Sequence, residues 1–305
     1  MELFAKHGVT PEILELEKGK SIDALAKDAV KRDFEIVVAG GGDGTVNAVA
    51  SELIGQKNRK LGVLPLGTFN HFARDMGVPV EIEEAVTSIV AGRAKAVDVG
   101  EVNGRIFLNN SCLGLYPEMV RLREGLQKSG YRKFPALLRA SFHILMRFPR
   151  LYLELHPEPG HSLRRSTPVL FIGNNAYDTR LTQLGKRASI DQGKLWLMMP
   201  TASTRWSLLV SLFGILVGRE KPDSVVTFEG TDMIVMGRRR LKVAIDGELL
   251  RLRPPLNYRI RPKALRVIVP PRQSGPARDT NLRAVGSPVP RRAVDPAAPT
   301  GRRQS

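Results

Sequence analysis

Apolar and polar residues follow two different periods along this chain, and the period changes near residue 95. Short apolar runs predict strands at 12–16, 35–39 and 61–66. Apolar residues at i, i+3, i+4 and i+7 predict helices at 21–31, 45–54 and 81–91. Strands that alternate with helices indicate a parallel, Rossmann-like α/β domain, which we place at residues 1–96. Ligands bind to such a sheet beyond the carboxyl ends of its strands.

From residue 97 the period becomes two, which predicts a β-sandwich domain over 97–270 and a nucleotide cleft between the two domains. Asn103-Gly104 is a signal for a type I′ hairpin turn. Further strands are predicted at 151–156, 168–173, 194–199, 225–229, 232–236, 241–246 and 264–269. Residues 271–305 hold six prolines, seven arginines and two aspartates, so we expect a disordered basic tail.

The glycine-rich loop after the second predicted strand is a candidate phosphate cradle. Gly40, Gly41, Gly42 and Gly44 surround Asp43, and Thr45 can cap or open the next helix. Glycines allow positive φ and a close approach to the backbone amides, and a helix N-terminus favours anions. The loop matches neither the P-loop nor the dinucleotide fingerprint. A carboxylate at position 43 suggests magnesium or a transferring proton, while the alternative is a tight turn whose glycines only permit packing.

A second strand, turn and helix follows at 61–75. Together, GGGDGTVNAVA and LGVLPLGTFNHFARDMGVP resemble the catalytic domain of diacylglycerol kinases, in the bacterial lipid kinase branch with sphingosine and ceramide kinase relatives. Further matches are Phe107-Leu108-Asn109-Asn110 with Gly114, and Asp246-Gly247-Glu248. The resemblance extends from about Phe4 to Pro270. NAD kinases share the Gly-Gly-Asp-Gly-Thr loop, but this chain lacks their later glycine- and serine-rich motif.

The resemblance implies an ATP- and Mg²⁺-dependent kinase that phosphorylates a lipid hydroxyl, in the first place that of diacylglycerol, to give phosphatidic acid. It implies that Glu248 accepts the hydroxyl proton and that Asp43 assists magnesium or proton transfer. Asp246-Gly247 also fits a plain hairpin turn. The residues implied to hold the nucleotide are Gly40, Gly41, Gly42, Asp43, Gly44, Thr45, Asn47, Thr68 and Asn70.

The chain departs from the family pattern in three places. The family's opening strand with its Asn-Pro and Gly motif is missing, so either the start codon has been assigned too late or this is a degenerate member. His71 replaces an aspartate, and we expect a surface histidine. Gln192, with Asp191 one residue early, stands where relatives bind a structural magnesium, and a neutral amide is a poorer ligand for that ion. A catalytically weak or inactive lipid- and nucleotide-binding protein is therefore the alternative function.

Composition limits the environment and the partners. Of the 305 residues 42% are hydrophobic, Cys112 is the only cysteine, and no apolar run reaches membrane-spanning length, from which we expect a cytoplasmic protein. The net charge of +17 favours polyanions. Residues 120–150 hold eight Lys or Arg against Glu124, which suits peripheral binding to an anionic membrane or an ordinary helix with a basic solvated face.

Other partners follow from the same residues. Residues 203–218 predict a buried helix rather than a lipid anchor. Nucleic acid is not expected as a partner, because aromatic residues make up 6% of the chain and no recognition motif accompanies the basic run. A homodimer is compatible with the sequence.

Overall fold

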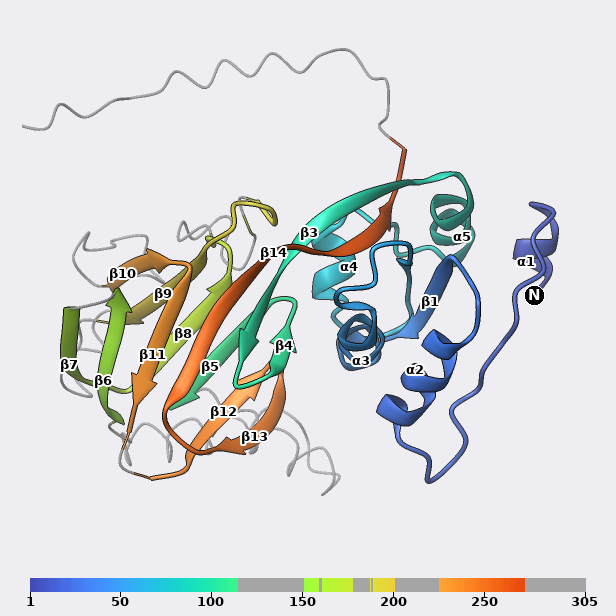
Figure 1. Ribbon diagram of the computed structural model, residues 1–305. Coiled ribbons are helices and arrows are strands. Elements are labelled where there is room, and N and C mark those ends of the chain that lie inside the picture. The colour runs from blue at the N-terminus through green and yellow to red at the C-terminus, as the bar shows by residue number, and fades with distance from the viewer. Residues whose placement is uncertain are drawn as a thin grey trace, which may run out of the picture. The chain divides into compact units, whose positions relative to one another are not determined.

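Figure 1 shows a computed structural model of the chain, and the structure describes residues 1–114, 151–158, 161–177, 187, 189–200, 225–237 and 239–271. Met1–Pro271 form one compact unit. Three predicted features lie outside the described residues: the basic segment 120–150, the buried helix at 203–218 and the disordered tail after Pro271.

The first part of the chain contains the predicted parallel α/β arrangement. β1 (Ile36–Gly41) and β2 (Lys60–Pro65) pair in parallel, with Ile36 opposite Lys60 and Gly41 opposite Pro65. The helices are α1 (Glu2–Ala5), α2 (Ile22–Lys31), α3 (Asp43–Leu53), α4 (His71–Asp75) and α5 (Ile82–Ala91). α2 begins where the Ser21 side chain accepts a hydrogen bond of 3.2 Å from the Asp23 amide, as a helix cap does. These predictions are confirmed.

The predicted strand at 12–16 is wrong. Glu12 to Leu16 is extended, but it belongs to no strand and gains no backbone partner among the described residues. Ile13 and Leu16 keep 54% and 52% of their surface exposed, so neither side chain joins a core. A strand is stabilised by a paired neighbour and not by its own period. Only the Glu12 side chain is held, by an ion pair with Arg32.

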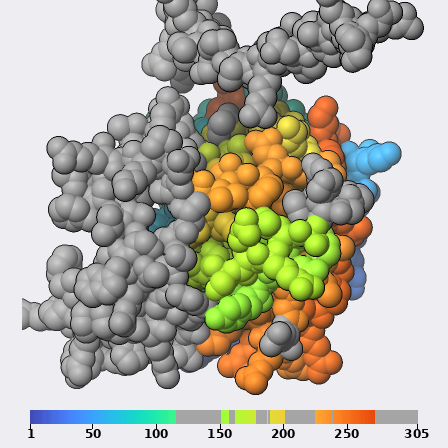
Figure 2. Space-filling view, turned by 90° about the vertical axis from the view of Figure 1, so that its left-hand side faces the viewer, coloured from blue at the N-terminus to red at the C-terminus, as the bar shows by residue number. Residues whose placement is uncertain are grey.

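A long C-terminal strand joins the α/β part to the rest of the first sheet. β14 (Leu256–Val269) lies parallel to β2 at Val267 and antiparallel to β3 (Arg93–Val102). The sheet runs β1-β2-β14-β11-β6-β7, with β3 and β4 (Arg105–Phe107) attached through β14. Its remaining strands are β11 (Asp232–Met236), β6 (Leu151–Glu158) and β7 (His161–Thr167). Figure 2 shows the side of the molecule on which β6 and β7 (green) lie, and β6 pairs with both β7 and β11.

The second sheet is entirely antiparallel, in the order β10-β9-β8-β5-β12-β13. Its strands are β10 (Val225–Gly230), β9 (Leu195–Pro200), β8 (Val169–Asn174), β5 (Asn110–Gly114), β12 (Leu241–Ile245) and β13 (Glu248–Leu252). Side chains of both sheets meet in one apolar core, for example Val235 and Leu256 of the first sheet with Ile172 and Leu197 of the second. The predicted sandwich is confirmed.

Two cores share the strands that link them. Val97 and Val267 belong to the core of the α/β part, whereas Val102 and Tyr258, farther along the same strands β3 and β14, belong to the sandwich core. The division that we place after residue 96 falls inside β3 and remains a proposal. The Asn103-Gly104 turn is confirmed, because both residues have positive φ, 47° and 82°. In the described part of the chain, no helix is long and apolar enough to cross a membrane.

Candidate active site

The glycine loop connects the end of β1 to the first turn of α3. Gly42 precedes the helix with φ −86° and ψ −175°, and none of the glycines at 40–44 has a positive φ, so our expectation of left-handed backbone is wrong. The glycines serve close packing instead. A Cβ atom on Gly67 would lie 2.4 Å from the Cα atom of Gly42, and one on Gly41 would lie 2.5 Å from the Thr45 hydroxyl oxygen. α3 begins at Asp43, so Thr45 lies inside its first turn and does not cap it.

The second turn, between β2 and α4, is held by Asn70. Its side-chain oxygen accepts from the Gly67 amide at 3.0 Å, and its nitrogen donates to the carbonyls of Pro65 and Gly67 at 3.0 and 2.9 Å. Asn70 is buried, with a φ of 51° that asparagine tolerates better than most residues. Its amide is thus engaged within the turn, whereas Thr68 is exposed. Their contact with a nucleotide remains a prediction.

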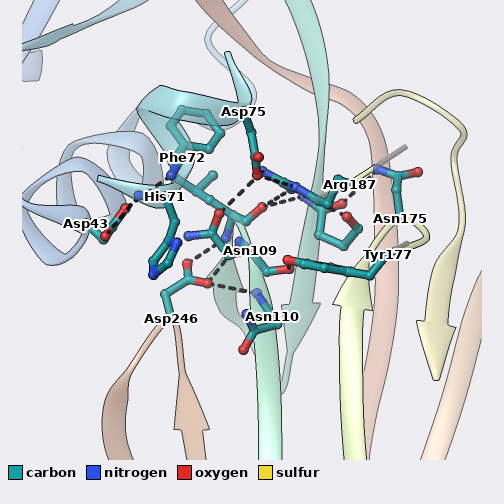
Figure 3. Close-up of polar contacts among 12 residues, drawn as sticks. Asp43, His71, Phe72, Asp75, Asn109, Asn110, Asn175, Tyr177, Arg187 and Asp246 are labelled. Atoms are coloured by element: carbon teal, nitrogen blue, oxygen red, sulfur yellow. Dashed lines mark hydrogen bonds and ion pairs between the residues drawn. The ribbon is translucent and has the colours of Figure 1, made fainter. Parts of the chain in front are cut away.

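Asp43 connects the two turns. Its carboxylate oxygens accept hydrogen bonds from the amides of His71 and Phe72, at 3.3 and 3.2 Å (Figure 3). These amides are the first of α4 and have no partner within the helix, so the carboxylate satisfies them and complements the helix dipole. His71 is exposed as expected, and its ring stacks on Phe69 with centroids 5.5 Å apart.

Asp246 is a central residue of the site, although the sequence indicated only a motif match and a hairpin turn for it and no role for its side chain. Its carboxylate accepts from the backbone amides of Leu108, Asn109 and Asn110 at 2.7, 2.9 and 3.0 Å, and from the side-chain amide of Asn47 at 2.7 Å. Burial raises the pKa of the Asp246 carboxyl, and these four N–H donors oppose that shift. Asn47, predicted to contact the nucleotide, thereby joins α3 to the β12–β13 turn.

The turn interpretation was nevertheless correct. Asp246 and Gly247 have φ values of 46° and 91° and connect β12 to β13. An aspartate in a tight hairpin gave no sequence signal for the four donors, because they come from residues that are more than 130 positions away. We call the hydrogen-bonded set of Asp43, Asn47, Asp246 and Leu108–Asn110, with the α4 amides bound to Asp43, the polar joint.

Glu248 begins β13 beside the glycine loop. A Cβ atom on Gly44 would lie 3.3 Å from its Oε1 atom, so the carboxylate rests against the first turn of α3. Burial, followed by the negative charges of Asp23 and Asp246, raises the pKa of Glu248, and Arg105 opposes the shift. The structure therefore brings together two predicted catalytic residues, Asp43 and Glu248, at the same helix end.

Arg187 is a second residue that sequence analysis missed. Its side chain is 1% exposed and forms an ion pair with Asp75, at 2.7 Å, at the C-terminal end of α4. It also donates to the Leu108 carbonyl at 2.6 Å and to the Asn109 side-chain oxygen at 3.3 Å. No motif includes Arg187, and its partners Asp75, Leu108 and Asn109 lie at least 78 positions away, so only the fold could identify its role.

The predicted magnesium ligands Asp191 and Gln192 lie apart from this site. Asp191 bonds with the Ser189 hydroxyl and faces the Lys95 ammonium at 3.6 Å, and the pKa of Asp191 is lowered by Ser189 first and by Lys95 next. The backbone amide of Gln192 donates to Asn175 at 3.0 Å. Within the described residues no group of three or more His, Cys, Asp or Glu could hold a metal ion. Our expectation that Asp191 and Gln192 make a poor structural magnesium site stays a prediction.

Comparisons with known proteins agree with the motif resemblance. Residues 1–102 match the family model of the diacylglycerol kinase catalytic domain. The chain is 46% identical over 96 residues to a diacylglycerol kinase of Bacillus subtilis (strain 168), which covers 31% of this chain and 32% of that protein. It is 30% identical over 265 residues, 84% of each chain, to a protein of Enterobacter sp. (strain 638) named "Probable lipid kinase YegS-like".

Solved structures share the fold. A crystal structure of a diacylglycerol kinase from Bacillus anthracis str. Sterne superposes with a TM-score of 0.57 and 18% identity, over 84% of this chain and 83% of that one. Another structure from the same organism reaches a TM-score of 0.63 with 22% identity, over 81% and 80% of the two chains. At such identities the likeness concerns the fold alone. Together with the sequence matches, these findings lead to one conclusion: the chain belongs to the diacylglycerol kinase catalytic domain family, among the bacterial diacylglycerol kinase and YegS-like lipid kinases.

Proposed function

We propose that this protein is an ATP-dependent lipid kinase that transfers the γ-phosphoryl group to the hydroxyl of diacylglycerol and forms phosphatidic acid. The observation that carries the proposal is the Glu248 carboxylate resting against Gly44 at the N-terminus of α3. A proton acceptor and an anion-binding helix end at the same place are what phosphoryl transfer to an alcohol requires. Membership of a lipid kinase family supports the choice of acceptor.

The nucleotide phosphates would bind at the glycine loop. Val46 is the first residue of α3 whose amide donates back, to the Gly42 carbonyl at 3.1 Å, so the preceding amides of Asp43, Gly44 and Thr45 have no partner within the helix. Magnesium, when bound with ATP, neutralises charge on the phosphates. Asp43 fits such an ion, since each of its carboxylate oxygens accepts one backbone hydrogen bond and keeps a lone pair.

Glu248 completes the chemistry. The lipid hydroxyl oxygen attacks the γ-phosphorus, an oxygen–phosphorus bond forms, and the bond to the bridging oxygen of ADP breaks, with its electron pair leaving on ADP. The hydroxyl proton passes to Glu248. A carboxylate with a raised pKa holds that proton more readily than one with an ordinary pKa.

The test is phosphate transfer from γ-labelled ATP to diacylglycerol in mixed micelles. Glu248→Gln keeps the shape and removes the proton acceptor, so turnover should fall by about 10² to 10⁴ while ATP affinity, measured by calorimetry, stays nearly constant. Glu154→Gln is the matched control and should leave turnover unchanged, because Glu154 lies on β6 and forms an ion pair with Arg164 on β7.

The rival assignment is tested by Asp43→Asn. Should Glu248→Gln keep more than about a tenth of turnover while Asp43→Asn is inactive but binds ATP, Asp43 is the base and Glu248 orients it. A wild-type chain that binds ATP and labels no lipid would be the catalytically weak member of the family.

The location and assembly of the protein belong to the same proposal. A kinase that acts on a membrane lipid must reach the bilayer, and a net charge of +17 favours peripheral binding to an anionic membrane from the cytoplasm. Liposome sedimentation at increasing salt tests this, because electrostatic binding weakens as charges are screened. A homodimer stays a prediction that analytical ultracentrifugation can decide.

A further inference from the structure

Arg187 is a buried cation outside the residues that touch substrates in the proposed reaction. Its Nε and Nη2 atoms both lie 2.7 Å from one carboxylate oxygen of Asp75, whose side chain is 19% exposed. Its Nη1 atom donates to the Leu108 carbonyl at 2.6 Å. A buried guanidinium is costly unless its donors are used, and here all three nitrogens have partners.

The partners of Arg187 are the neighbours of both proposed catalytic carboxylates. Asp75 ends α4, and the opposite end of this helix supplies the two amides that bind Asp43. Leu108 presents its carbonyl to Arg187 and its amide to Asp246, two residues before Glu248. Figure 3 shows this sequence of contacts, with Arg187 and Asp75 on one side of Asn109 and Asp246 on the other. Arg187 therefore binds the Leu108–Asn109 part of the polar joint directly and is linked to the Asp43 part through Asp75 and α4, without contacting Asp43 or Glu248.

We propose that Arg187 is a positioning residue, which sets the placement of the Asp43 loop relative to Glu248 during phosphoryl transfer. The proposal rests on the proposed function of that site. α4 has only five residues and packs Phe72 and Ala73 in the core, so the polar contacts at its two ends help to fix its position. The Leu108–Asn109 segment is held by Asp246 and Arg187, and also by Asn174 and Tyr177. Removing Arg187 takes one charged contact from each, and a displacement of about 1 Å can reduce a rate by about 10²-fold.

The central variant is Arg187→Met, which keeps an unbranched side chain and removes the charge and every donor. We expect kcat to fall about 10- to 100-fold and ATP affinity to stay within about threefold, because the cradle itself is intact. Arg187→Lys keeps the charge but loses the forked geometry, so it should recover part of kcat. It also provides a folded variant if Arg187→Met does not fold.

Arg259→Met is the matched control. Arg259 binds the buried carboxylate of Glu101 through Nε and Nη2, at 3.0 and 2.7 Å, on β14 and away from the polar joint. Arg259→Met therefore removes an arginine–carboxylate ion pair without touching α4 or Leu108, although the Arg259 side chain is 52% exposed and Glu101 keeps its ion pair with Arg261. Its folded fraction should keep the wild-type kcat.

Hydrogen exchange gives a readout that does not depend on activity. In Arg187→Met or Arg187→Lys, the amides of His71 and Phe72 and those of Leu108–Asn110 should exchange faster than in the wild type, and in Arg259→Met they should not. In a Glu248→Gln background, adding Arg187→Met should change kcat much less than it does alone, because the group being positioned is absent.

The outcomes separate the two proposals. A wild-type protein that phosphorylates no lipid overturns the proposed function. In that case amide hydrogen exchange alone still tests whether Arg187 positions α4 and the Leu108–Asn110 segment. Unchanged exchange at both sets of amides in both Arg187 variants overturns the positioning role. So does an equal loss of kcat in Arg187→Met and Arg259→Met once each is corrected for its folded fraction.

Discussion

The polar joint and the sandwich core stabilise the molecule by opposite means. In the core, apolar side chains from two sheets pack together, and residues such as Leu197 and Val235 are almost fully buried. In the joint, two aspartates accept hydrogen bonds from backbone amides of distant segments, and the Asn47 side chain donates to one of them, Asp246. Apolar packing is non-directional and mainly sets stability. Hydrogen bonds to carboxylates are directional, so they set the distances between groups.

The largest effect that this comparison predicts is for Asp246→Ala. It leaves three backbone amides and the Asn47 side chain without their acceptor, and each buried unsatisfied donor costs about 1–3 kcal/mol. We expect the free energy of unfolding in urea to fall by more than about 3 kcal/mol and kinase turnover to be lost. Asp246→Asn keeps one acceptor oxygen and should be the milder variant.

Leu197→Ala is the core counterpart of that change. Removing this buried side chain should cost about 2–5 kcal/mol of stability, yet the folded fraction should keep the wild-type kcat. Equal loss of kcat in the Leu197 and Asp246 variants, after correction for folding, would contradict the view that the core mainly sets stability and the polar joint sets the distances between groups.

The next effect concerns the contact between the two glycine turns. In Gly67→Ala the new Cβ would lie 2.4 Å from the Cα of Gly42 and 2.8 Å from the Asn70 side-chain oxygen, so the turns must separate. We expect ATP affinity in calorimetry to fall by about tenfold or more, since displaced amides bind phosphate less well. Gly55→Ala is the control, because φ of +82° strains the backbone there but nothing lies within 4 Å. An unchanged ATP affinity in folded Gly67→Ala would contradict the assignment of the glycine loop as the phosphate-binding site.

The smallest effect is a shift in pH dependence. Burial is the main cause that raises the pKa of Glu248, and the charge of Asp23 is the next. Asp23→Asn should therefore lower this pKa and move the acid limb of the kcat–pH profile to lower pH, since the base must be deprotonated. Asp28→Asn, on the same helix and paired with Arg32, should not move it.

The same raised pKa fixes the sign of a stability effect. Because folding raises the pKa of Glu248, its contribution to stability is complete below its unfolded pKa and is lost as pH rises through its folded pKa. Glu248→Gln should thus lose less stability than the wild type between acidic and neutral pH, as measured by urea unfolding. A parallel loss in both proteins would assign the proton uptake to another group.

Much of the fold follows from local signals. Ser21 and the spacing after it predict α2, and Asn103-Gly104 predicts the β3–β4 turn, because a cap and a type I′ turn depend on a few adjacent residues. The strand at 12–16 failed because a partner strand decides whether an extended apolar run enters a sheet. The sequence located the glycine loop correctly, but the reason that we gave, positive φ, is wrong. The glycines instead allow close packing against Gly67.

The sequence by itself determined the two periods of the chain, the family, and the two loops that carry Asp43 and Glu248. Each of these depends on residues that are near one another in the chain, where composition and spacing suffice. Only the tertiary structure decided that the Asp246 carboxylate accepts four hydrogen bonds and that the side chains of Asn47 and Asn70 bond to other groups of the protein. It also decided that Arg187 connects α4 to Leu108. These contacts join residues far apart in the sequence, and hydrogen bonds at such separations are selected by the packing of β3, β14 and the short α4 and not by any local pattern.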